Sequence, residues 1–397
     1  MMSKKSPQLR FEGFTDDWEE RKLKDIAKFN PKAVLPDEFE YVDLESVVGT
    51  EMISHRTESK EQAPSRARRL AQKGDVFYQT VRPYQMNNYL YDLPYDNYVF
   101  STGYAQMRPN IDSYFLLNSV QNKQFVQHVL DRSTGTSYPA INSSDLSNIE
   151  IYVPVHKEEQ EKIGSFFKQL DKTIALHQRK LDLLKEQKKG FLQKMFPKNG
   201  AKVPELRFAG FADDWEERKL NEVSDIYDGT HQTPKYQDNG VMFLSVENIK
   251  TLTSNKFISR EAFEDEFKIR PQRGDVLMTR IGDIGTANVV ETDEDLAYYV
   301  SLALFKSEEL NPYFLQASIY APFVQDQIWK RTLHIAFPKK INKNEIGQVP
   351  INVPTLAEQT KIGSFFKQLD KTIALHQRKL DLLKEQKKGF LQTMFVK

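Results

Sequence analysis

One set of residues has the spacing of a metal-dependent nuclease. Asp37 follows a proline, and Glu58 precedes Lys60 by two positions, which matches the pattern P-D…E-x-K. Such an enzyme needs the two carboxylates and the lysine on adjoining core strands, where they can hold a metal ion. The surrounding segment, HRTESKEQAPSR, is polar and predicts a loop. The match is therefore interpreted as coincidence, and a metal-dependent nuclease is kept as an alternative function.

Other sequence patterns that carry catalysis are missing. Neither G-x-x-x-x-G-K-S/T nor G-x-G-x-x-G occurs, so no glycine-rich loop can cradle a phosphate. The seven histidines lack metal-ligand spacing, and there is no cysteine. Asn311-Pro312-Tyr313-Phe314 resembles the N-P-P-Y/F motif of amino-methyltransferases but lacks its second proline, so it predicts a helix N-cap followed by proline at the first helical position. The sequence predicts no catalytic residue, no metal ligand and no cofactor in this chain.

Basic, amide and aromatic residues gather in two stretches. Arg and Lys contact phosphate or guanine, and Asn and Gln can pair with adenine through two hydrogen bonds. Arg82 and Arg280 each come just after a G-D-V segment and are the preferred candidates for a base or phosphate contact. A solvated loop is the alternative for each cluster. The candidate DNA contacts are Arg66, Arg68, Arg69, Tyr78, Gln79, Arg82, Tyr84, Asn87 and Asn88 in the first stretch, and Thr230, His231, Thr233, Lys235, Tyr236, Arg280, Thr286, His334, Lys339, Lys340 and Lys343 in the second.

The bulk composition limits the classes of protein that fit. The 397 residues suffice for two or three domains, and the formal net charge is only +1, so any nucleic-acid contact must come from local clusters. The absence of cysteine fits a reducing cytoplasm. The N-terminus, MMSKKSPQLRF, lacks the apolar region of a secretory signal, and no apolar run is long enough to span a membrane. We expect a soluble, cytoplasmic, globular protein.

The elements that must position these residues are set by an internal repeat. Residues 159–196 and 358–395 differ only at Glu161/Thr360 and Lys194/Thr393, and PQLRFEGFTDDWEERKL from Pro7 returns as PELRFAGFADDWEERKL. The segments between the copies differ in sequence but share short β-rich runs such as FEYVDLESVV, GDVFYQTV, GVMFLSVENI and GDVLMTRI, and each is predicted to hold one helix before its end. A repeat on this scale predicts one fold, used twice with two different surfaces.

The near-identical stretches are predicted to be long helices. Apolar residues recur in an a/d heptad pattern over about five heptads, so each helix needs a partner for its apolar stripe. The copies favour antiparallel pairing within the chain with pseudo-twofold symmetry, and an intermolecular coiled coil is the alternative. Thr355 and Glu358 form a predicted capping box, and the helix glycines predict close backbone approach or bends. The predicted seam consists of Ile163, Phe167, Leu170, Ile174, His177, Leu181, Leu184, Phe191, Ile362, Phe366, Leu369, Ile373, His376, Leu380, Leu383 and Phe390.

The opening PxLRFxGFxDxWEERKL together with the helix ending KLDLLKEQKKGFLQKMF resembles the specificity subunit of Type I restriction–modification enzymes, in the form common in Firmicutes. The resemblance covers the whole chain. It implies that each insert reads one half of a bipartite double-stranded DNA target, while the two helices fix the spacing of the half-sites. It also implies two modification subunits that use S-adenosylmethionine to methylate adenine, and restriction subunits that use ATP and Mg²⁺. The specificity subunit itself would have no active site.

The sequence therefore predicts an α+β chain with two similar globular target-recognition domains separated by an antiparallel coiled coil. The predicted segments are recognition domain 1 at 1–154, helix 1 at 155–197, a linker at 198–203, recognition domain 2 at 204–354 and helix 2 at 355–397. A coiled-coil scaffold that binds proteins through its inserts is the alternative from another class.

Overall fold

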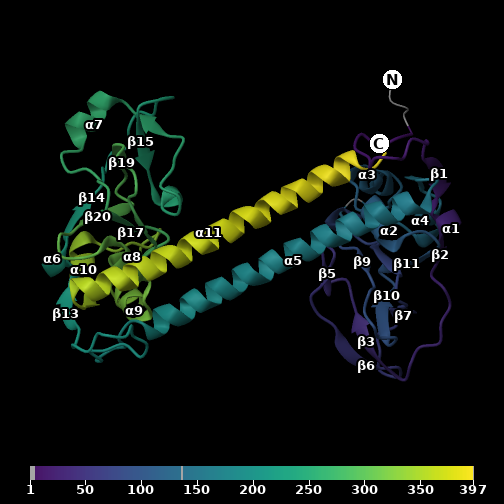
Figure 1. The fold of residues 1–397 in the computed structure, drawn as a ribbon, viewed down its shortest axis with the longest axis horizontal. Coiled ribbons are helices and arrows are strands. Elements are labelled where there is room, and N and C mark those ends of the chain that lie inside the picture. The colour runs from purple at the N-terminus through teal and green to yellow at the C-terminus, as the bar shows by residue number, and fades with distance from the viewer. Residues whose placement is uncertain (1–4, 136, 397) are drawn as a thin grey trace. The chain divides into compact units, whose positions relative to one another are not determined.

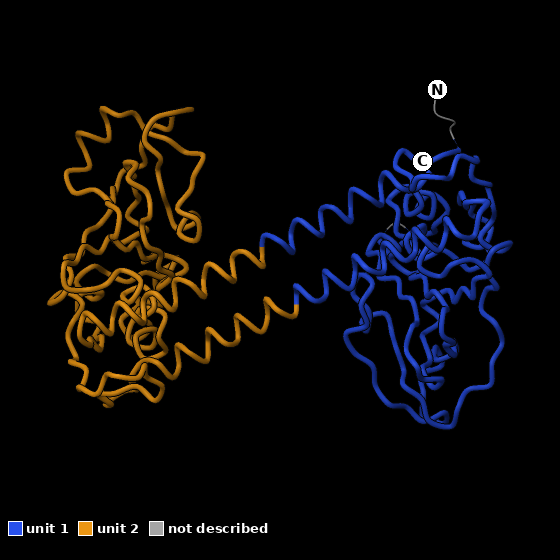
Figure 2. The backbone as a smooth tube through the Cα atoms, in the orientation of Figure 1, with its two compact units in different colours: residues 1–178, 378–397 blue, residues 179–377 orange. Residues whose placement is uncertain are grey.

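The computed structural model describes residues 5–135 and 137–396. They form two compact units: unit 1 contains Met1–Gln178 and Arg378–Lys397, and unit 2 contains Arg179–Gln377 (Figure 2). Two 38-residue helices, α5 (Lys157–Lys194) and α11 (Leu356–Thr393), contribute to both units (Figure 1). Each unit is thus a globular α/β part plus a segment of each long helix. The predicted mixed fold with two long helices is confirmed.

The described residues of unit 1 form two four-stranded sheets, a short two-stranded ribbon and a separate two-stranded hairpin. The ribbon pairs the repeated opening segment with the strand that leads into α5. The strands are β1 (Glu19–Lys22) with β12 (Glu150–Val153); β6 (Arg56–Ser59), β3 (Glu38–Val42), β10 (Tyr98–Ser101) and β7 (Ala67–Leu70); β2 (Ala27–Phe29), β11 (Tyr104–Pro109), β8 (Val76–Gln79) and β9 (Tyr89–Leu90); and the hairpin β4 (Val47–Val48) with β5 (Glu51–Met52). The shorter helices are α1 (Leu23–Ile26), η1 (Pro83–Gln85), α2 (Ser113–Val120), α3 (Lys123–Asp131) and α4 (Ser143–Ser147).

Unit 2 repeats this plan with a different second sheet. Its strands are β13 (Glu216–Lys219) with β21 (Pro350–Val353); β14 (Asp225–Asp228), β20 (Leu302–Lys306), β17 (Val276–Thr279) and β18 (Ala287–Val289); and β16 (Phe257–Ile258), β15 (Val241–Leu244) and β19 (Leu296–Tyr298). The shorter helices are α6 (Leu220–Val223), η2 (Val246–Asn248), α7 (Arg260–Glu266), α8 (Pro312–Tyr320), α9 (Pro322–Arg331) and α10 (Lys343–Gly347).

The four β-rich runs form strands β3, β8, β15 and β17, as predicted. Two local predictions are wrong. Each insert holds several helices rather than one, and residues 56–59 form strand β6 rather than a loop. Strand β6 is an edge strand exposed over most of its length, so burial imposes little alternation of apolar and polar residues on it.

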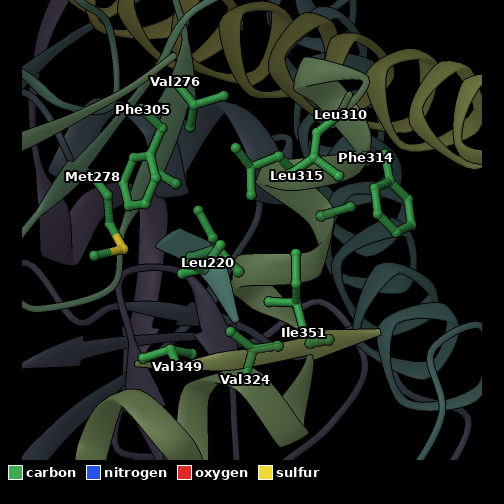
Figure 3. Close-up of a cluster of buried hydrophobic side chains, with 14 of the residues drawn as sticks. Leu220, Val276, Met278, Phe305, Leu310, Phe314, Leu315, Val324, Val349 and Ile351 are labelled. Carbon is green, nitrogen blue, oxygen red and sulfur yellow. The ribbon is translucent and has the colours of Figure 1, made fainter. Parts of the chain in front are cut away.

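Each globular core is closed by the phenylalanine that follows a long helix. Phe395 lies within 5.8 Å of Phe167, measured between ring centroids, and also contacts Trp18 and Phe115. In unit 2, Phe196 has the equivalent surroundings of Trp215, Phe314 and Phe366. Figure 3 shows the cluster around Phe314, where side chains from α8, β17, β20 and β21 converge. The repeat therefore preserves the contacts that attach each long helix to a core.

The long helices pair antiparallel within each unit. In unit 1, Phe166 contacts Phe390 and, further along α5, Asp171 binds Lys387 at 2.6 Å, so residue numbers rise on one helix as they fall on the other. In unit 2, Phe191 contacts Phe365 and Lys188 binds Asp370 at 2.6 Å. Half of the predicted seam is buried: Ile163, Phe167, Leu181, Leu184, Ile362, Phe366, Leu380 and Leu383. The other half is partly exposed: Leu170, Ile174, His177, Phe191, Leu369, Ile373, His376 and Phe390.

The predicted capping box on α11 forms only in part. The Glu358 backbone N–H donates to the Thr355 hydroxyl at 3.4 Å, but the Glu358 carboxylate instead accepts two hydrogen bonds from Arg207 at 2.7 and 2.8 Å. Unit 1 repeats this pair, with Arg10 donating to Glu159 at 2.6 and 2.9 Å. Both carboxylates are buried, and a paired arginine is what makes such burial tolerable. The arginine of the repeated RFxGF segment thus fastens each opening segment to a long helix.

The helix glycines have two different environments. A Cβ at Gly164 would lie 2.0 Å from the Oδ1 of Asp112, and a Cβ at Gly363 would lie 2.3 Å from the Oδ1 of Asn311. Asp112 and Asn311 are the N-caps of α2 and α8, so the predicted close approach is confirmed at these two glycines. The predicted N-cap role of Asn311, followed by proline at the first helical position, is also confirmed. At the other helix glycines, Gly190 and Gly389, a Cβ would meet no atom within 4 Å.

Candidate nucleic-acid interface

The side chain of Arg280 is part of the core of unit 2 rather than its surface. It is 7% exposed, donates from Nε to the carbonyl of Ile341 at 3.2 Å and pairs through a terminal nitrogen with Asp228. This arrangement ties the end of β14 to the segment after residue 340. The expectation that Arg280 contacts DNA does not fit its burial, because a guanidinium held by a carboxylate and a carbonyl has little surface to offer a base.

The two G-D-V segments do lead into equivalent loops, but Arg82 and Arg280 are not equivalent within them. The Arg82 backbone N–H donates to the carbonyl of Pro139 at 2.8 Å, and in unit 2 the same bond runs from Gly282 to Lys339 at 2.8 Å. Two residues earlier, the carbonyl of Arg280 accepts from Ile341, as Thr80 accepts from Ile141. Arg82 therefore corresponds to Gly282, and Thr80 to Arg280.

In unit 1 the loop after β8 is built on buried amides. Gln79 is 0% exposed; its backbone N–H donates to Asn88 Oδ1 at 2.8 Å, and its side chain donates to the Val81 carbonyl and to Gln85. Gln79 and Asn88 thus shape the loop from inside. The loop places Arg82, Tyr84 and Asn87 at its surface, where they are exposed or half-buried. Of the five amide, arginine and tyrosine candidates in this region, only these three have exposed surface, and Asn87 Oδ1 already accepts from the Gly49 N–H at 2.8 Å.

The remaining candidates of unit 1 lie at β7 and within β8 itself. Arg66 and Arg68 are exposed at β7, while Arg69 is half-buried, and burial lowers the pKa of its guanidinium. The Tyr78 side chain is buried in the core, and this burial raises the pKa of its hydroxyl. Arg66 nevertheless lies close to the loop after β8, although the strands belong to different sheets. Its carbonyl accepts from the Thr102 N–H at 2.8 Å, and the carbonyl of the next residue, Gly103, accepts from the Thr80 N–H at 2.9 Å.

The candidate DNA contacts of unit 2 are likewise partly buried in the fold and partly exposed. Thr230 is buried and bonded to Glu266, and Thr286 is half-buried, with its hydroxyl donating to Asp283 at 3.0 Å. The other candidates from the segment after β14 are exposed: His231, Thr233, Lys235 and Tyr236. His334, Lys339 and Lys340 are also exposed, and Lys343 is half-buried. Arg280 connects the start of the first segment to the loop that carries the second group.

A second loop in each unit carries exposed apolar or aromatic side chains that sequence reasoning missed, although His334, Lys339 and Lys340 on the loop of unit 2 were among the predicted DNA contacts. In unit 2 it runs over residues 333–340 and exposes Ile335 and Phe337 completely. Its counterpart in unit 1 exposes Tyr138 by 70%, and the Arg82 guanidinium lies 5.9 Å from the centre of the Tyr138 ring. The detectable signal was an aromatic residue before proline in a polar segment, Phe337-Pro338 in unit 2 and Tyr138-Pro139 in unit 1. The two pairs are offset by one residue, because the backbone hydrogen bonds match Pro139 with Lys339.

Each unit also holds a cleft beside the helix pair. The cleft of unit 1 has a volume of about 530 Å³ and that of unit 2 about 420 Å³. Three lysines of each cleft come from the same positions of the repeat, Lys384, Lys387 and Lys388 in unit 1 and Lys185, Lys188 and Lys189 in unit 2, while Lys123 and Lys172 line the cleft of unit 1 in addition. Because these three helix lysines are the same, they cannot account for any difference in what the two units recognise.

The structure gives the nuclease alternative no support. Asp37 and Glu58 do lie on or beside adjacent strands, where the Lys60 backbone N–H donates to the Asp37 carbonyl at 2.8 Å. However, the Glu58 carboxylate accepts from Arg56 at 2.7 Å. Over residues 5–135 and 137–396, no group of three His, Asp or Glu side chains is placed to hold a metal ion. Within the same residues, no helix is long and apolar enough to cross a membrane.

Comparison with known proteins agrees with this arrangement. The Type I restriction enzyme MjaVIII specificity subunit of Methanocaldococcus jannaschii is 24% identical over 303 residues, which cover 72% of this chain and 70% of the relative. The Type I restriction–modification S subunit from M. genitalium has the same fold, with a TM-score of 0.69 at 14% identity over 98% of this chain and 99% of its own. A chain from a type I R-M system, solved to explain complex assembly and conformational transition, aligns with a TM-score of 0.53 at 23% identity over 94% of this chain and 96% of its own. The family described as the Type I restriction modification DNA specificity domain matches residues 15–186 and again 212–385, so the chain belongs to this family, with two copies of its domain.

Proposed function

We propose that this chain is the DNA-recognition subunit of a Type I restriction–modification complex. The observation that carries the proposal is the double family match on two units that share a frame and differ in their loops. Recognition domain 1 at 1–154 reads one half of a bipartite target and recognition domain 2 at 204–354 reads the other. The segments 155–197 and 355–397 are the helices, and 198–203 is the linker between repeats.

The difference between the half-sites comes from the loops. Unit 1 offers Arg82, Tyr84 and Asn87 after β8, whereas unit 2 has a glycine in place of Arg82 and offers Lys339 and Lys340 from its second loop. Amides and arginine discriminate bases by paired hydrogen bonds, and lysines bind phosphate as point charges. Unit 1 therefore reads its half-site through polar contacts of the first loop, and unit 2 relies more on its second loop.

Chemistry on the DNA belongs to partner subunits. Modification subunits bind S-adenosylmethionine and methylate adenine, and restriction subunits use ATP and Mg²⁺ for translocation and cleavage. The chain contributes sequence recognition and holds the half-sites at a fixed separation through α5 and α11. Inserting one heptad into each helix should then change the preferred spacer and leave the half-site bases unchanged.

An exchange of inserts tests the proposal. Residues 221–354 are placed in the frame of the first repeat in place of residues 24–154, and methylated adenines are mapped in cells that carry the variant with its modification subunit. We expect a symmetric target in which the second half-site occurs twice in opposite orientation. An active complex that still marks the original asymmetric sequence contradicts modular reading. A chain with no salt-dependent preference for its mapped target would instead favour the scaffold alternative.

A further inference from the structure

The loop over residues 333–340 exposes apolar side chains that the fold does not use. Ile335 and Phe337 are fully exposed, and Trp329 at the end of α9 is 56% exposed. Side chains of this size bury apolar surface when they bind, so a group of them left open on a folded unit marks an interaction site. Both units have this loop, so each unit presents an exposed apolar or aromatic side chain at the same place in the fold.

The base of this loop is held firmly, so its tip is presented in a defined place. The Leu333 backbone N–H donates to the Lys340 carbonyl at 2.7 Å, and the Gly282 N–H donates to the Lys339 carbonyl at 2.8 Å. Arg280 fixes the next residue by donating to the Ile341 carbonyl while it pairs with Asp228. Arg280 is thus a positioning residue for the loop. The exposed side chains extend from an anchored base.

The charge around the loop selects the class of partner. Residues 329–343 contain five Lys or Arg residues and no Asp or Glu, against a net charge of +1 for the whole chain. Lys330 is paired with Asp326 at 2.5 Å, and the Lys339 ammonium lies 4.7 Å from the centre of the Trp329 ring. Apolar side chains flanked by cations match the minor-groove proteins that insert a wedge between base pairs while lysines bind the adjoining phosphates. Double-stranded DNA is the partner with this complementary charge.

We propose that Ile335 and Phe337 form an apolar wedge that enters a base step of the target DNA, with Lys339 and Lys340 on the flanking phosphates. This rests on the proposed function and specifies how unit 2 engages its half-site. Tyr138 occupies the equivalent loop of unit 1, beside Arg82, and stacks against the DNA there. The two units use equivalent loops with different side chains, so DNA deformation adds to the asymmetry of the target.

The test measures binding and bending of DNA by the chain assembled with its modification subunits. The probes are a 40-base-pair duplex that carries the target found by methylation mapping and a scrambled duplex, each with a fluorophore at either end. The Ile335→Ala/Phe337→Ala variant should bind the target about tenfold more weakly, which corresponds to about 1.4 kcal/mol. It should also lose most of the bend reported by energy transfer between the ends. The matched control is Val34→Ala, another exposed apolar residue, which should change neither quantity.

The lysine variant and the wedge variant should give different results in this assay. Lys339→Ala/Lys340→Ala should lower affinity for both duplexes and reduce the slope of log affinity against log salt by about 2, whereas the wedge variant should keep the slope. Tyr138→Ala should weaken binding while leaving the base preferences of the second half-site intact.

Two results would overturn the wedge while the recognition function stands. One is a wedge variant that binds and bends the target as the wild type does. The other is a variant that no longer assembles with the modification subunit by size-exclusion chromatography, which makes the loop a protein contact. If the wild-type complex itself fails to prefer its target over the scrambled duplex, the proposed function fails and the wedge fails with it.

Discussion

Two glycines of the long helices should respond in opposite ways to the same substitution. Gly164 and Gly389 both belong to unit 1 and both lie inside a helix. A Cβ at Gly164 would meet Asp112 Oδ1 at 2.0 Å and the Phe115 backbone nitrogen at 3.2 Å, whereas a Cβ at Gly389 would meet open space. We therefore expect Gly164→Ala to destabilise unit 1 and Gly389→Ala to leave it unchanged or more stable.

The magnitudes follow from the contacts. Replacing a helical glycine with alanine gains up to about 1 kcal/mol from helix propensity, and Gly389→Ala should keep that gain. At Gly164 the new methyl group must displace the Asp112 carboxylate, which accepts from the Phe115 N–H at 2.7 Å. Losing an N-cap costs about 1 kcal/mol, and overpacking a close contact costs roughly 1–3 kcal/mol. The net expectation is that Gly164→Ala destabilises unit 1 by about 1–3 kcal/mol.

The assay is urea unfolding followed by tryptophan fluorescence. The chain has three tryptophans, of which Trp18 lies in unit 1 while Trp215 and Trp329 lie in unit 2. A background with Trp215→Phe and Trp329→Phe leaves Trp18 as the reporter of unit 1. A double-mutant cycle with Asp112→Ala then isolates the contact, because that change removes the atoms that the new methyl group would strike.

Two outcomes would refute this reasoning. The first is a Gly164→Ala variant as stable as Gly389→Ala, which would mean that α5 and the start of α2 are not in close contact. The second is a Gly164→Ala cost that persists unchanged when Asp112 is alanine, which would place the strain elsewhere. Gly363→Ala and Gly190→Ala repeat the comparison in unit 2, with Asn311 in the role of Asp112.

Two further predictions concern the frame of the units. Phe395→Ala should destabilise unit 1 and Phe196→Ala should destabilise unit 2, each by about 3–5 kcal/mol, because both rings are buried among equivalent aromatic neighbours. If both variants shifted the unfolding midpoints reported by Trp18 and by Trp215 equally, the two cores would not be separate. Burial raises the pKa of the Asp112 carboxyl, so the folded state favours its protonated form, and stability from this group is lost as pH rises through the raised value. Asp112→Asn introduces the residue type that unit 2 has at the equivalent position, Asn311. It should therefore raise the unfolding midpoint at neutral pH, and this gain in stability should shrink as the buffer is acidified.

The long helices and the repeated frame could be predicted because their signals are local and periodic. The heptad pattern required a partner, and the only near-copy of the helix lies in the same chain. The N-cap at Asn311 was predictable for a similar reason, since capping depends on residues within one turn. Strand β6 was missed because an edge strand that is exposed along most of its length carries no periodic apolar signal.

The roles of individual loop residues depended on contacts between distant segments. Arg280 looked like a DNA contact because it is basic and follows a strand, but its partner Asp228 lies 52 positions earlier in the chain. Arg82 looked equivalent to Arg280 until the backbone hydrogen bonds showed a shift of two residues. The sequence shows which side chains are present, but only the fold shows whether a basic side chain such as Arg280 is already paired with a carboxylate.

The division between repeated and divergent residues explains how one frame can serve two targets. The repeated arginine–glutamate pairs, the close-approach glycines and the terminal phenylalanines all act between a long helix and the part of the domain that touches it. None of these contacts includes the loops after β8 and β17 or the loops that end at Ala140 and Lys340. Those loops are anchored by backbone hydrogen bonds, which any sequence can make, so their side chains are free to differ. A new recognition surface can therefore arise by changing loop side chains alone, provided that a residue such as Arg280 or Gln79 still supports each loop from within.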